Sequence, residues 1–259
     1  MSLAGREILR GIDLAFIAGS FVGLIGPNGA GKSTLMRVLA GLLPASGEVS
    51  IGSRALGSLT AKERAREIAY LPQNRDIAWP IAVEAVVALA RLPHRPAFTG
   101  PSGHDRKVID RSIAEMGLER FRQRRASELS GGELARVLVA RALAQETDII
   151  IADEPTAGLD PAHQLSLMQI FQRLAGSGRT VIASLHELSL AARWCDRLVL
   201  LDGGQIIADG RPEDVLTPDQ LKSVYGIDAF IGRDAGGLLL VPTNLSESRA
   251  DAKRLTPQP

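Results

Sequence analysis

The chain has one cysteine, no long apolar run and almost no net charge, and each shortage excludes a class of protein. Cys195 is alone among 259 residues and forms no internal disulfide, which is typical of a reducing compartment. No uninterrupted apolar stretch reaches the roughly 18 residues that span a bilayer. Glu7 and Asp13 interrupt the N-terminal stretch, which argues against a secretion signal. We therefore expect a cytoplasmic protein that reaches a membrane only through a partner.

The balance of charge argues against a broad nucleic-acid-binding face. The chain carries 30 Lys and Arg residues against 29 Asp and Glu residues, so its net charge is +1. One local basic cluster stands out, and its simplest interpretation is a solvated helix end. The cluster consists of Arg120, Arg122, Arg124 and Arg125. A hydrophobic content of 45% over this length is enough for one α/β core with an inserted subdomain.

The first chemical signal is an apolar strand that runs directly into a glycine-rich loop. Residues 21–25 (FVGLI) are apolar on both faces, as in a buried parallel strand, and a helix is expected over residues 33–40. Glycines let the loop turn tightly and aim backbone amides at a polyphosphate, while Lys32 adds a full charge and Ser33 a hydroxyl for Mg²⁺. Such a loop also occurs as an ordinary turn, but the flanking strand and helix favour a phosphate site. The candidate nucleotide-binding residues are Gly26, Pro27, Asn28, Gly29, Ala30, Gly31, Lys32, Ser33 and Thr34.

A second apolar strand, over residues 148–152, ends in two acidic residues. Ligands gather at the carboxyl ends of strands in open α/β sheets. Asp153 is the candidate that holds Mg²⁺ through its water shell, and Glu154 the candidate general base for an attacking water. A solvated acidic pair explains the two residues alone. It does not explain the longer run DEPTAGLD, in which Pro155 stops the strand and Asp160 begins the next helix.

The third signal is the run LSGGE at residues 129–133. Ser130 offers a hydroxyl, and Gly131 and Gly132 allow a close backbone approach. A helix is expected to begin at Glu133 and to run to residue 144, with its dipole directed at a phosphate. Ser-Gly-Gly is also an ordinary helix-start turn, but that alternative loses weight after two phosphate motifs.

In this order and spacing, the motifs resemble those of the ATP-binding subunit of an ABC transporter, over roughly residues 9–231. The resemblance implies an α/β fold, a P-loop NTPase core of the ABC type with a parallel sheet and an inserted helical subdomain. It implies that two copies form a head-to-tail homodimer in which the signature meets the γ phosphate of ATP held by the opposing copy. Nucleotide contacts are thereby implied for Ser130, Gly131, Gly132, Glu133 and Asp160.

The same resemblance implies roles for two polar residues that carry little weight alone. Gln73 would reach Mg²⁺ and the attacking water, and His186 would contact the γ phosphate and orient the base. A lone glutamine or histidine in a loop is more often simply solvated. The catalytic candidates are Glu154, His186 and Gln73, and the metal candidates are Ser33, Gln73 and Asp153, with ATP and Mg²⁺ as cofactors. His94, His104 and His163 show no ligand spacing, so no other metal is expected.

The chain departs from the family pattern at two places. Glu133 replaces the usual signature glutamine, and Leu134 and Ala135 replace basic residues, but neither change removes a phosphate contact. No aromatic residue stands near Ser2, where the family stacks a ring on adenine. Two explanations fit this absence: the adenine base is recognised weakly, or the gene start is set too late, so that the N-terminus is shortened. We favour the shortened N-terminus, because Met1 leaves little room for the family's first edge strand. A preference for ATP over GTP therefore follows from the resemblance alone.

The domain organisation follows from the motifs. Residues 1–240 are expected to form a single ATPase domain, with residues 1–72 and 130–240 as the core and residues 73–129 as the helical subdomain. An apolar helix over 82–91 and an amphipathic helix over 105–116 are expected within this insertion. The polar residues 241–259 are expected to form a disordered tail.

Two further segments, residues 87–95 and 212–227, resemble the cassettes of importers for iron-siderophore, haem or vitamin B12. The resemblance implies an ATP-hydrolysing import subunit that works with two transmembrane permease subunits and, indirectly, a periplasmic or surface substrate-binding protein. It would lie on the cytoplasmic face of the inner membrane. Trp79 and Pro80 are the expected docking point for the permease, with a buried core tryptophan as the competing explanation. No nucleic-acid partner is expected.

Three alternatives remain open. The chain could serve another transporter class, or it could be a non-transport ABC ATPase that acts on DNA or ribosomes. The second is disfavoured because the chain has one set of motifs, no heptad run and no cysteine cluster. A nucleotide-binding regulator without hydrolysis is disfavoured by the presence of Glu154 and His186.

Overall fold

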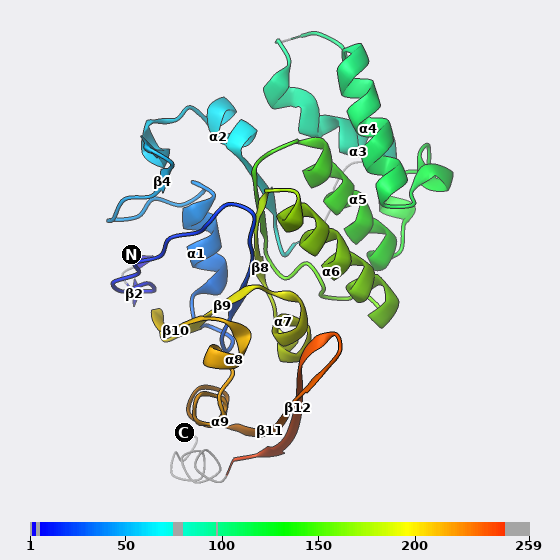
Figure 1. The fold of residues 1–259 in the computed structure, drawn as a ribbon. Coiled ribbons are helices and arrows are strands. Elements are labelled where there is room, and N and C mark those ends of the chain that lie inside the picture. The colour runs from blue at the N-terminus through cyan, green and yellow to red at the C-terminus, as the bar shows by residue number, and fades with distance from the viewer. Residues whose placement is uncertain (1, 4–5, 75–79, 97, 247–259) are drawn as a thin grey trace, which may run out of the picture.

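A six-stranded, mostly parallel sheet forms the centre of the molecule (Figure 1). The structure is a computed structural model that describes residues 2–3, 6–74, 80–96 and 98–246. The strand order is β10-β9-β3-β8-β7-β6, and every neighbouring pair is parallel except β10 with β9. This confirms the expected α/β fold. The strands are β3 (Phe21–Ile25), β6 (Ile68–Leu71), β7 (Ile149–Ala152), β8 (Thr180–Ser184), β9 (Arg197–Asp202) and β10 (Gln205–Gly210).

The parallel strands of the sheet are buried on both faces, whereas the edge strand β10 is partly exposed, and successive strand residues contribute to two separate cores. In β9, Leu198 and Leu200 belong to one core, whereas Val199 and Leu201 belong to the other. Helices α5, α6 and α7 cover the first face and α1 the second. This two-sided burial explains why the strands read as unbroken apolar runs. The helices are α1 (Lys32–Leu39), α5 (Gly131–Ala144), α6 (Pro161–Gly176) and α7 (Leu188–Trp194).

A helical lobe is inserted between β6 and α5, at the upper right of Figure 1. Its main helices, α3 (Val83–Ala88) and α4 (Gly103–Glu115), both pack against α5. The helix expected over 82–91 ends at Ala88 and continues as a 3₁₀ helix, Leu89–His94. Pro93 accounts for the change, because proline lacks an amide and disfavours the α conformation of the residue before it. Two more 3₁₀ turns, Glu119–Phe121 and Ala126–Glu128, lead to α5.

Small elements surround the core. Two short hairpins are formed by β1 (Ser2–Leu3) with β2 (Arg6–Glu7) and by β4 (Ser50–Ile51) with β5 (Arg54–Ala55). A 3₁₀ turn, Leu56–Ser58, then leads to α2 (Ala61–Glu67). Within the described residues no helix is both long enough and apolar enough to cross a membrane.

The C-terminal part adds a hairpin that packs against α7, at the bottom of Figure 1. Short helices α8 (Pro212–Val215) and α9 (Pro218–Gln220) and a π-helical turn, Leu221–Tyr225, lead to β11 (Ile227–Asp234) and β12 (Gly237–Leu245). The expectation of a disordered tail from residue 241 is therefore wrong for 241–245. These residues are exposed, but their backbone pairs with β11 as far as Ile227. The rest of that expectation, residues 247–259, lies outside the described residues.

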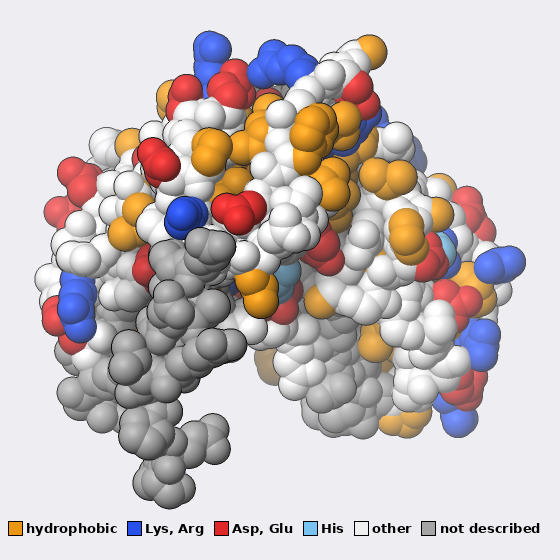
Figure 2. Space-filling view, turned by 90° about the horizontal axis from the view of Figure 1, so that it is seen from below, with side chains coloured by type: hydrophobic (Ala, Val, Ile, Leu, Met, Phe, Trp, Pro, Cys, Tyr) orange, Lys and Arg blue, Asp and Glu red, His pale blue; other side chains and the backbone are white. Residues whose placement is uncertain are grey.

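Charged side chains of both signs are interspersed on the molecular face seen in Figure 2, and apolar side chains gather over its upper middle. The basic cluster noted in the sequence is partly neutralised by acidic neighbours. Arg122 pairs with Glu84, at 2.9 Å, and with Asp110. Arg124 and Arg125 both lie within 4.0 Å of the Glu128 carboxylate.

A buried ion cluster joins the helical lobe to the end of α5. Arg91 is 2% exposed, and its guanidinium donates to Asp105 at 2.8 Å, to the Ala144 carbonyl at 2.8 Å and to Glu146 at 3.0 Å. Burial acts to raise the pKa of Asp105, but hydrogen bonds from Arg91 and Ser102 outweigh it and hold that pKa well below its usual value. The carboxylate form of Asp105 is thus tied to the folded state.

We expect Arg91→Met to lower the free energy of unfolding by about 3–5 kcal/mol at neutral pH, because it leaves a buried carboxylate without its cation. The native Asp105 pKa is depressed, so its contribution is complete above the unfolded pKa of about 4, begins to decline at pH 3.5 and is lost only as the pH falls through the lower native pKa. Urea unfolding at pH 7 and at pH 3.5 checks both effects. The matched control is Arg111→Met. The exposed Arg111 guanidinium also pairs with Glu146, and its removal should lower the free energy of unfolding by less than about 1 kcal/mol. Equal losses for the two variants at pH 7 would contradict the account.

Candidate functional site

A cleft of about 640 Å³ lies where β3 runs into α1. The glycine-rich loop lines it, and so does Glu154 at the end of β7. The cleft therefore unites the two motifs that the sequence predicts to bind phosphate and activate water. Its lining consists of Glu7, Ile8, Arg10, Asn28, Gly29, Ala30, Gly31, Lys32, Ser33, Thr34, Glu154 and Gly203.

Two glycines fix the path of the loop. Gly26 and Gly31 adopt φ values of 146° and 103°, which L side chains rarely adopt. A Cβ on Gly26 would lie 2.1 Å from the Leu201 carbonyl oxygen, so no side chain fits there. Gly31 is the N-cap of α1 and provides no side-chain cap. The amides at the start of α1 are consequently left for a ligand, as in an anion site at a helix N-terminus.

Lys32 is folded back over its own loop. Its Nζ donates to the carbonyl oxygens of Gly26, at 2.6 Å, and Pro27, at 3.1 Å. Burial lowers the pKa of Lys32 from its usual value, while the charges of Glu154 and Asp153 oppose the shift. The cation is thus held in the cleft, close to the acidic pair.

Asp153 is buried beside two hydroxyl groups. Its Oδ1 accepts from Ser33 Oγ at 3.1 Å and from Ser184 Oγ at 2.8 Å. Its Oδ2 is buried with no partner in hydrogen-bond geometry among the described residues. A buried, unsatisfied carboxylate oxygen next to a serine hydroxyl suits a hard divalent cation that binds oxygen, such as Mg²⁺. Two of the three metal candidates, Ser33 and Asp153, are therefore in contact.

Glu154 brings the three catalytic candidates together. Its Oε2 accepts from Gln73 Nε2 at 2.7 Å, and its Oε1 lies 2.5 Å from His186 Nε2. The backbone of Glu154 has φ of 49°, a left-handed conformation that costs about 1–3 kcal/mol for a residue other than glycine. Strained backbone of this kind clusters at functional sites. Gln73, Glu154 and His186 follow β6, β7 and β8, three neighbouring strands of the sheet.

The signature residues lie outside this cleft. Ser130 caps α5 in a reciprocal box with Glu133: the Glu133 amide donates to Ser130 Oγ at 3.3 Å, and the Ser130 amide donates to Glu133 Oε2 at 2.9 Å. The bond from the Ser130 amide, and a second from the Ser130 hydroxyl to the same carboxylate at 3.0 Å, lower the pKa of Glu133. None of the four signature residues, Ser130, Gly131, Gly132 and Glu133, lines the cleft. Within one copy, Glu133 acts as a helix cap.

Asp160 is also placed away from the cleft. It is the N-cap of α6 and accepts from the His163 amide at 3.0 Å. His163 Nδ1 lies 2.5 Å from the other carboxylate oxygen, and the amide and ring contacts together lower the pKa of Asp160. The structure thus gives this candidate a local capping role.

Several residues of the site carry no recognisable sequence signal. Ile8 and Arg10 line the cleft from the N-terminal segment, and Ser184 contacts the acidic pair. Only the appearance of a serine in a buried apolar strand two residues before His186 could have indicated Ser184. Trp79, the expected docking residue, lies outside the described residues, and Pro80 is exposed.

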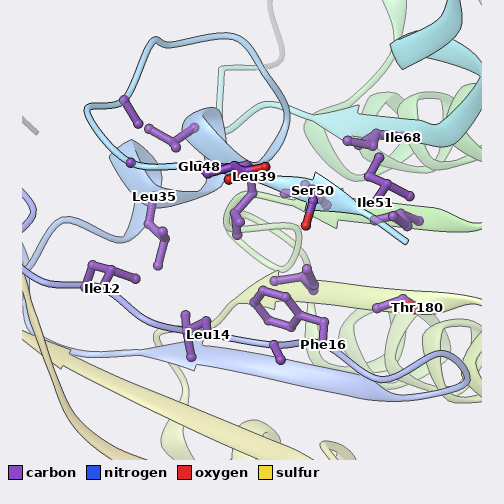
Figure 3. A pocket seen from close by; sticks show the side chains of 18 of the residues that line it. Ile12, Leu14, Phe16, Leu35, Leu39, Glu48, Ser50, Ile51, Ile68 and Thr180 are labelled. Atoms are coloured by element: carbon purple, nitrogen blue, oxygen red, sulfur yellow. The ribbon is translucent and has the colours of Figure 1, made fainter. Parts of the chain in front are cut away.

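A larger cavity, of about 1190 Å³, lies between α1, the N-terminal segment and the sheet, and neither the glycine-rich loop nor the acidic pair lines it. Figure 3 shows Ile12, Leu14 and Phe16, at alternate positions of the N-terminal segment, pointing into the same hollow as Leu35 and Leu39 of α1. Its labelled side chains are mostly aliphatic or aromatic and it lacks the loop amides and the acidic pair. It is therefore not the candidate phosphate site.

Comparison with known proteins agrees with the motifs. Residues 9–157, more than half of the chain, match the family model described as ABC transporter. The hemin import ATP-binding protein HmuV of Bradyrhizobium diazoefficiens is 38% identical over 260 residues, covering 96% of this chain and 95% of the relative. The cobalamin import ATP-binding protein BtuD of Halobacterium salinarum is 39% identical over 246 residues, and the match covers 93% of this chain. The chain spans 61% of the length of that relative.

Two solved structures show the same architecture. An inward-facing ABC transporter assigned to the metal-chelate type aligns with a TM-score of 0.75 and 25% identity, over 92% of this chain and 90% of that one. A dimeric ATP-binding cassette in a post-hydrolysis state, bound to ADP and Pi, aligns with a TM-score of 0.72 and 31% identity, over 79% and 90% of the two chains.

We expect Gly26→Ala to lower the free energy of unfolding of the nucleotide-free protein by about 2–6 kcal/mol, from backbone strain and overpacking together. Gly29→Ala is the matched control, because Gly29 also has positive φ, of 81°, but faces open space. It should cost only about 1–2 kcal/mol. Chemical denaturation of both variants measures the difference. A Gly26→Ala variant no less stable than Gly29→Ala would show that the contact with Leu201 does not constrain the loop.

Proposed function

Because the chain belongs to the ABC transporter family, we propose that it is the ATP-hydrolysing subunit of an importer that takes up a metal chelate such as haem, cobalamin or an iron-siderophore. The observation that carries the ATPase assignment is the convergence of two features in one cleft. A phosphate-binding loop meets a strained glutamate that contacts both a glutamine and a histidine.

ATP would bind with its polyphosphate against the loop and the start of α1. Loop amides and the helix dipole attract the phosphate oxygens, and Lys32 supplies a full charge to the β and γ phosphates. Ser33 and Asp153 would hold Mg²⁺, with Gln73 reaching towards it. The ion would neutralise charge on the β and γ phosphates. The open Oδ2 of Asp153 supports this assignment.

Hydrolysis would proceed by attack of water on the γ phosphorus. A bond forms between the water oxygen and phosphorus while the bond to the β–γ bridging oxygen breaks, which yields ADP and inorganic phosphate. Glu154 would accept the proton of the attacking water or hold that water in line. Gln73 and His186 would orient Glu154 and the water, and both contact the Glu154 carboxylate.

The signature would act across a homodimer. Ser130, Gly131, Gly132 and Glu133 lie outside the cleft of their own copy, so a phosphate contact from them requires a second copy. The N-terminus of α5 is capped by Ser130, but Ser130 and Gly131 are exposed, and the helix dipole there suits the γ phosphate of a nucleotide held by that copy. Asp160 would join the same interface. Dimerisation of a similar cassette bound to ADP and Pi supports this arrangement.

The cassette would act at the cytoplasmic face of the membrane, bound to two permease subunits. A substrate-binding protein would take part only through the permease. Similarity to hemin and cobalamin import ATP-binding proteins and to a metal-chelate type transporter supports this class of cargo. The core at 1–72 and 130–240 would carry the ATP chemistry, and the lobe at 73–129 would carry the permease contact, with the signature directly after it.

Replacement of Glu154 by Gln should lower kcat for ATP hydrolysis at least about 100-fold, because the amide accepts no proton, while ATP binding is retained. The variant should accumulate as an ATP-bound dimer. Phosphate release and size-exclusion chromatography with MgATP measure the two effects. Glu119→Gln, an exposed residue of the helical lobe, is the matched control and should behave like the wild type. Normal turnover by Glu154→Gln would disprove the assignment of the base.

Replacement of Lys32 by Ala should abolish nucleotide binding, because it removes the only full positive charge that the loop holds over the phosphates. Binding of a fluorescent ATP analogue measures this loss. Lys62→Ala, on the surface of α2, serves as the control for loss of a lysine elsewhere. An analogue affinity unchanged by Lys32→Ala would place the phosphates outside the loop.

The transport assignment is tested by a pull-down of tagged Glu154→Gln from native membranes with MgATP. Recovery of a polytopic permease is the expected result, and its associated binding protein would identify the cargo. Recovery of only ribosomal or DNA-bound proteins would overturn the transport function and leave the ATPase chemistry intact.

A further inference from the structure

We propose that Ser184 is a positioning residue that holds the metal-binding carboxylate and the catalytic glutamate in register with each other. The inference rests on the proposed ATP hydrolysis at the same site. Ser184 is the last residue of β8 and is 0% exposed. Its hydroxyl contacts Asp153 and Glu154, and it does not line the cleft, so its effect must pass through those two residues.

The hydroxyl of Ser184 both accepts and donates a hydrogen bond. It accepts a hydrogen bond from the Glu154 backbone amide at 2.7 Å and donates one to Asp153 Oδ1 at 2.8 Å. An amide only donates, so the direction of the first bond is fixed and the hydroxyl proton is available for the carboxylate. One side chain therefore connects the backbone of the candidate base to the side chain of the candidate metal ligand.

This connection matters because the backbone of Glu154 is strained. A residue with φ of 49° remains in that conformation only where its surroundings hold it. Ser184 holds the amide end of Glu154, while Gln73 and His186 hold the two carboxylate oxygens. Without the hydroxyl, the amide loses its acceptor and the peptide is free to relax from the left-handed region. The carboxylate would then move relative to the water and the γ phosphate.

The position of β8 in the sheet makes Ser184 suited to this role. The strand lies between β3 and β7, with Leu24 opposite Ser184 and Ala152 opposite Ala183. Ser184 consequently ends beside Asp153, and the chain reaches His186 two residues later. The same strand end supplies both the hydroxyl under Glu154 and the ring beside its carboxylate.

A structural role would give a different pattern of effects. A buried hydroxyl that only stabilises the sheet would, when removed, lower the amount of folded enzyme and leave the turnover of each folded molecule unchanged. A positioning role lowers kcat with little change in KM for ATP, because the phosphate loop and Lys32 are untouched. Slow hydrolysis with intact ATP binding would also populate the ATP-bound dimer. A variant that is only less stable in its fold would not accumulate this dimer.

The test compares Ser184→Ala with two rescue variants and one control. Ser184→Thr keeps the hydroxyl but adds a methyl group, and Ser184→Cys keeps a weaker donor without that branch. Thr180→Val removes a buried hydroxyl at the opposite end of the same strand. For each full-length protein, kcat, KM, the midpoint of thermal unfolding and the ATP-bound dimer fraction are measured, with wild type and Glu154→Gln alongside.

We expect kcat of Ser184→Ala to fall about 10- to 100-fold, the usual loss when a partner that orients a metal ligand is removed. KM should change less than about threefold, and the ATP-bound dimer should accumulate, as is also expected for Glu154→Gln. Ser184→Thr should recover most of the rate, and Ser184→Cys should recover part of it if threonine does not fit. Thr180→Val should match the wild type.

Wild-type turnover by folded Ser184→Ala, with no accumulation of the dimer, would overturn the positioning role. So would equal losses for Ser184→Ala and Thr180→Val that follow their unfolding midpoints. An inactive wild type would instead refute the proposed ATPase function itself, so the two failures are distinguishable.

Discussion

The site depends on one constraint, the register of neighbouring parallel strands whose carboxyl ends meet at the same edge of the sheet. The order β3-β8-β7-β6 places the phosphate loop, the Ser184–His186 turn, the acidic pair and Gln73 side by side. Side chains of each strand alternate between the two cores. If the pairing of a strand shifted by one residue, every side chain of that strand would point into the opposite core. The packing of apolar residues on both faces therefore fixes distances among polar groups that follow the strands.

The helical lobe packs against α5 through apolar residues of α3 and α4, and a charged junction adds to this contact at the end of α5. Arg91 connects the lobe to the end of α5, and His94 lies 2.9 Å from the Gln145 carbonyl oxygen. The side-chain amide of Gln145 in turn donates to the carbonyl oxygens of Ala65, at 2.6 Å, and Ile68, at 2.9 Å. The far end of α5 carries Ser130. A single helix thus runs from the signature to the junction, so any movement of the lobe would carry the signature with it.

Much of the fold could be predicted because its signals are local. Strand Phe21–Ile25 was predicted to the residue, since an apolar run that meets a glycine-rich loop defines it. The shortened α3 and the extension of β12 to Leu245 were not. The first depends on Pro93, and the second on backbone pairing beneath polar side chains. Gln73, Glu154 and His186 could be grouped only through the family resemblance. Ser184 had only its place in an apolar strand before His186 as a signal, and a single serine in a strand forms no pattern.

The most direct test of the account is a crystal structure of the Glu154→Gln protein with MgATP. The γ phosphate should lie between Lys32 of one copy and Ser130 of a second copy, with the metal on Ser33 and Asp153. The side-chain amide introduced at position 154 should face a water in line with phosphorus. Phosphates bound away from Lys32, or a site completed within one copy, would contradict the central claim that two copies share each nucleotide.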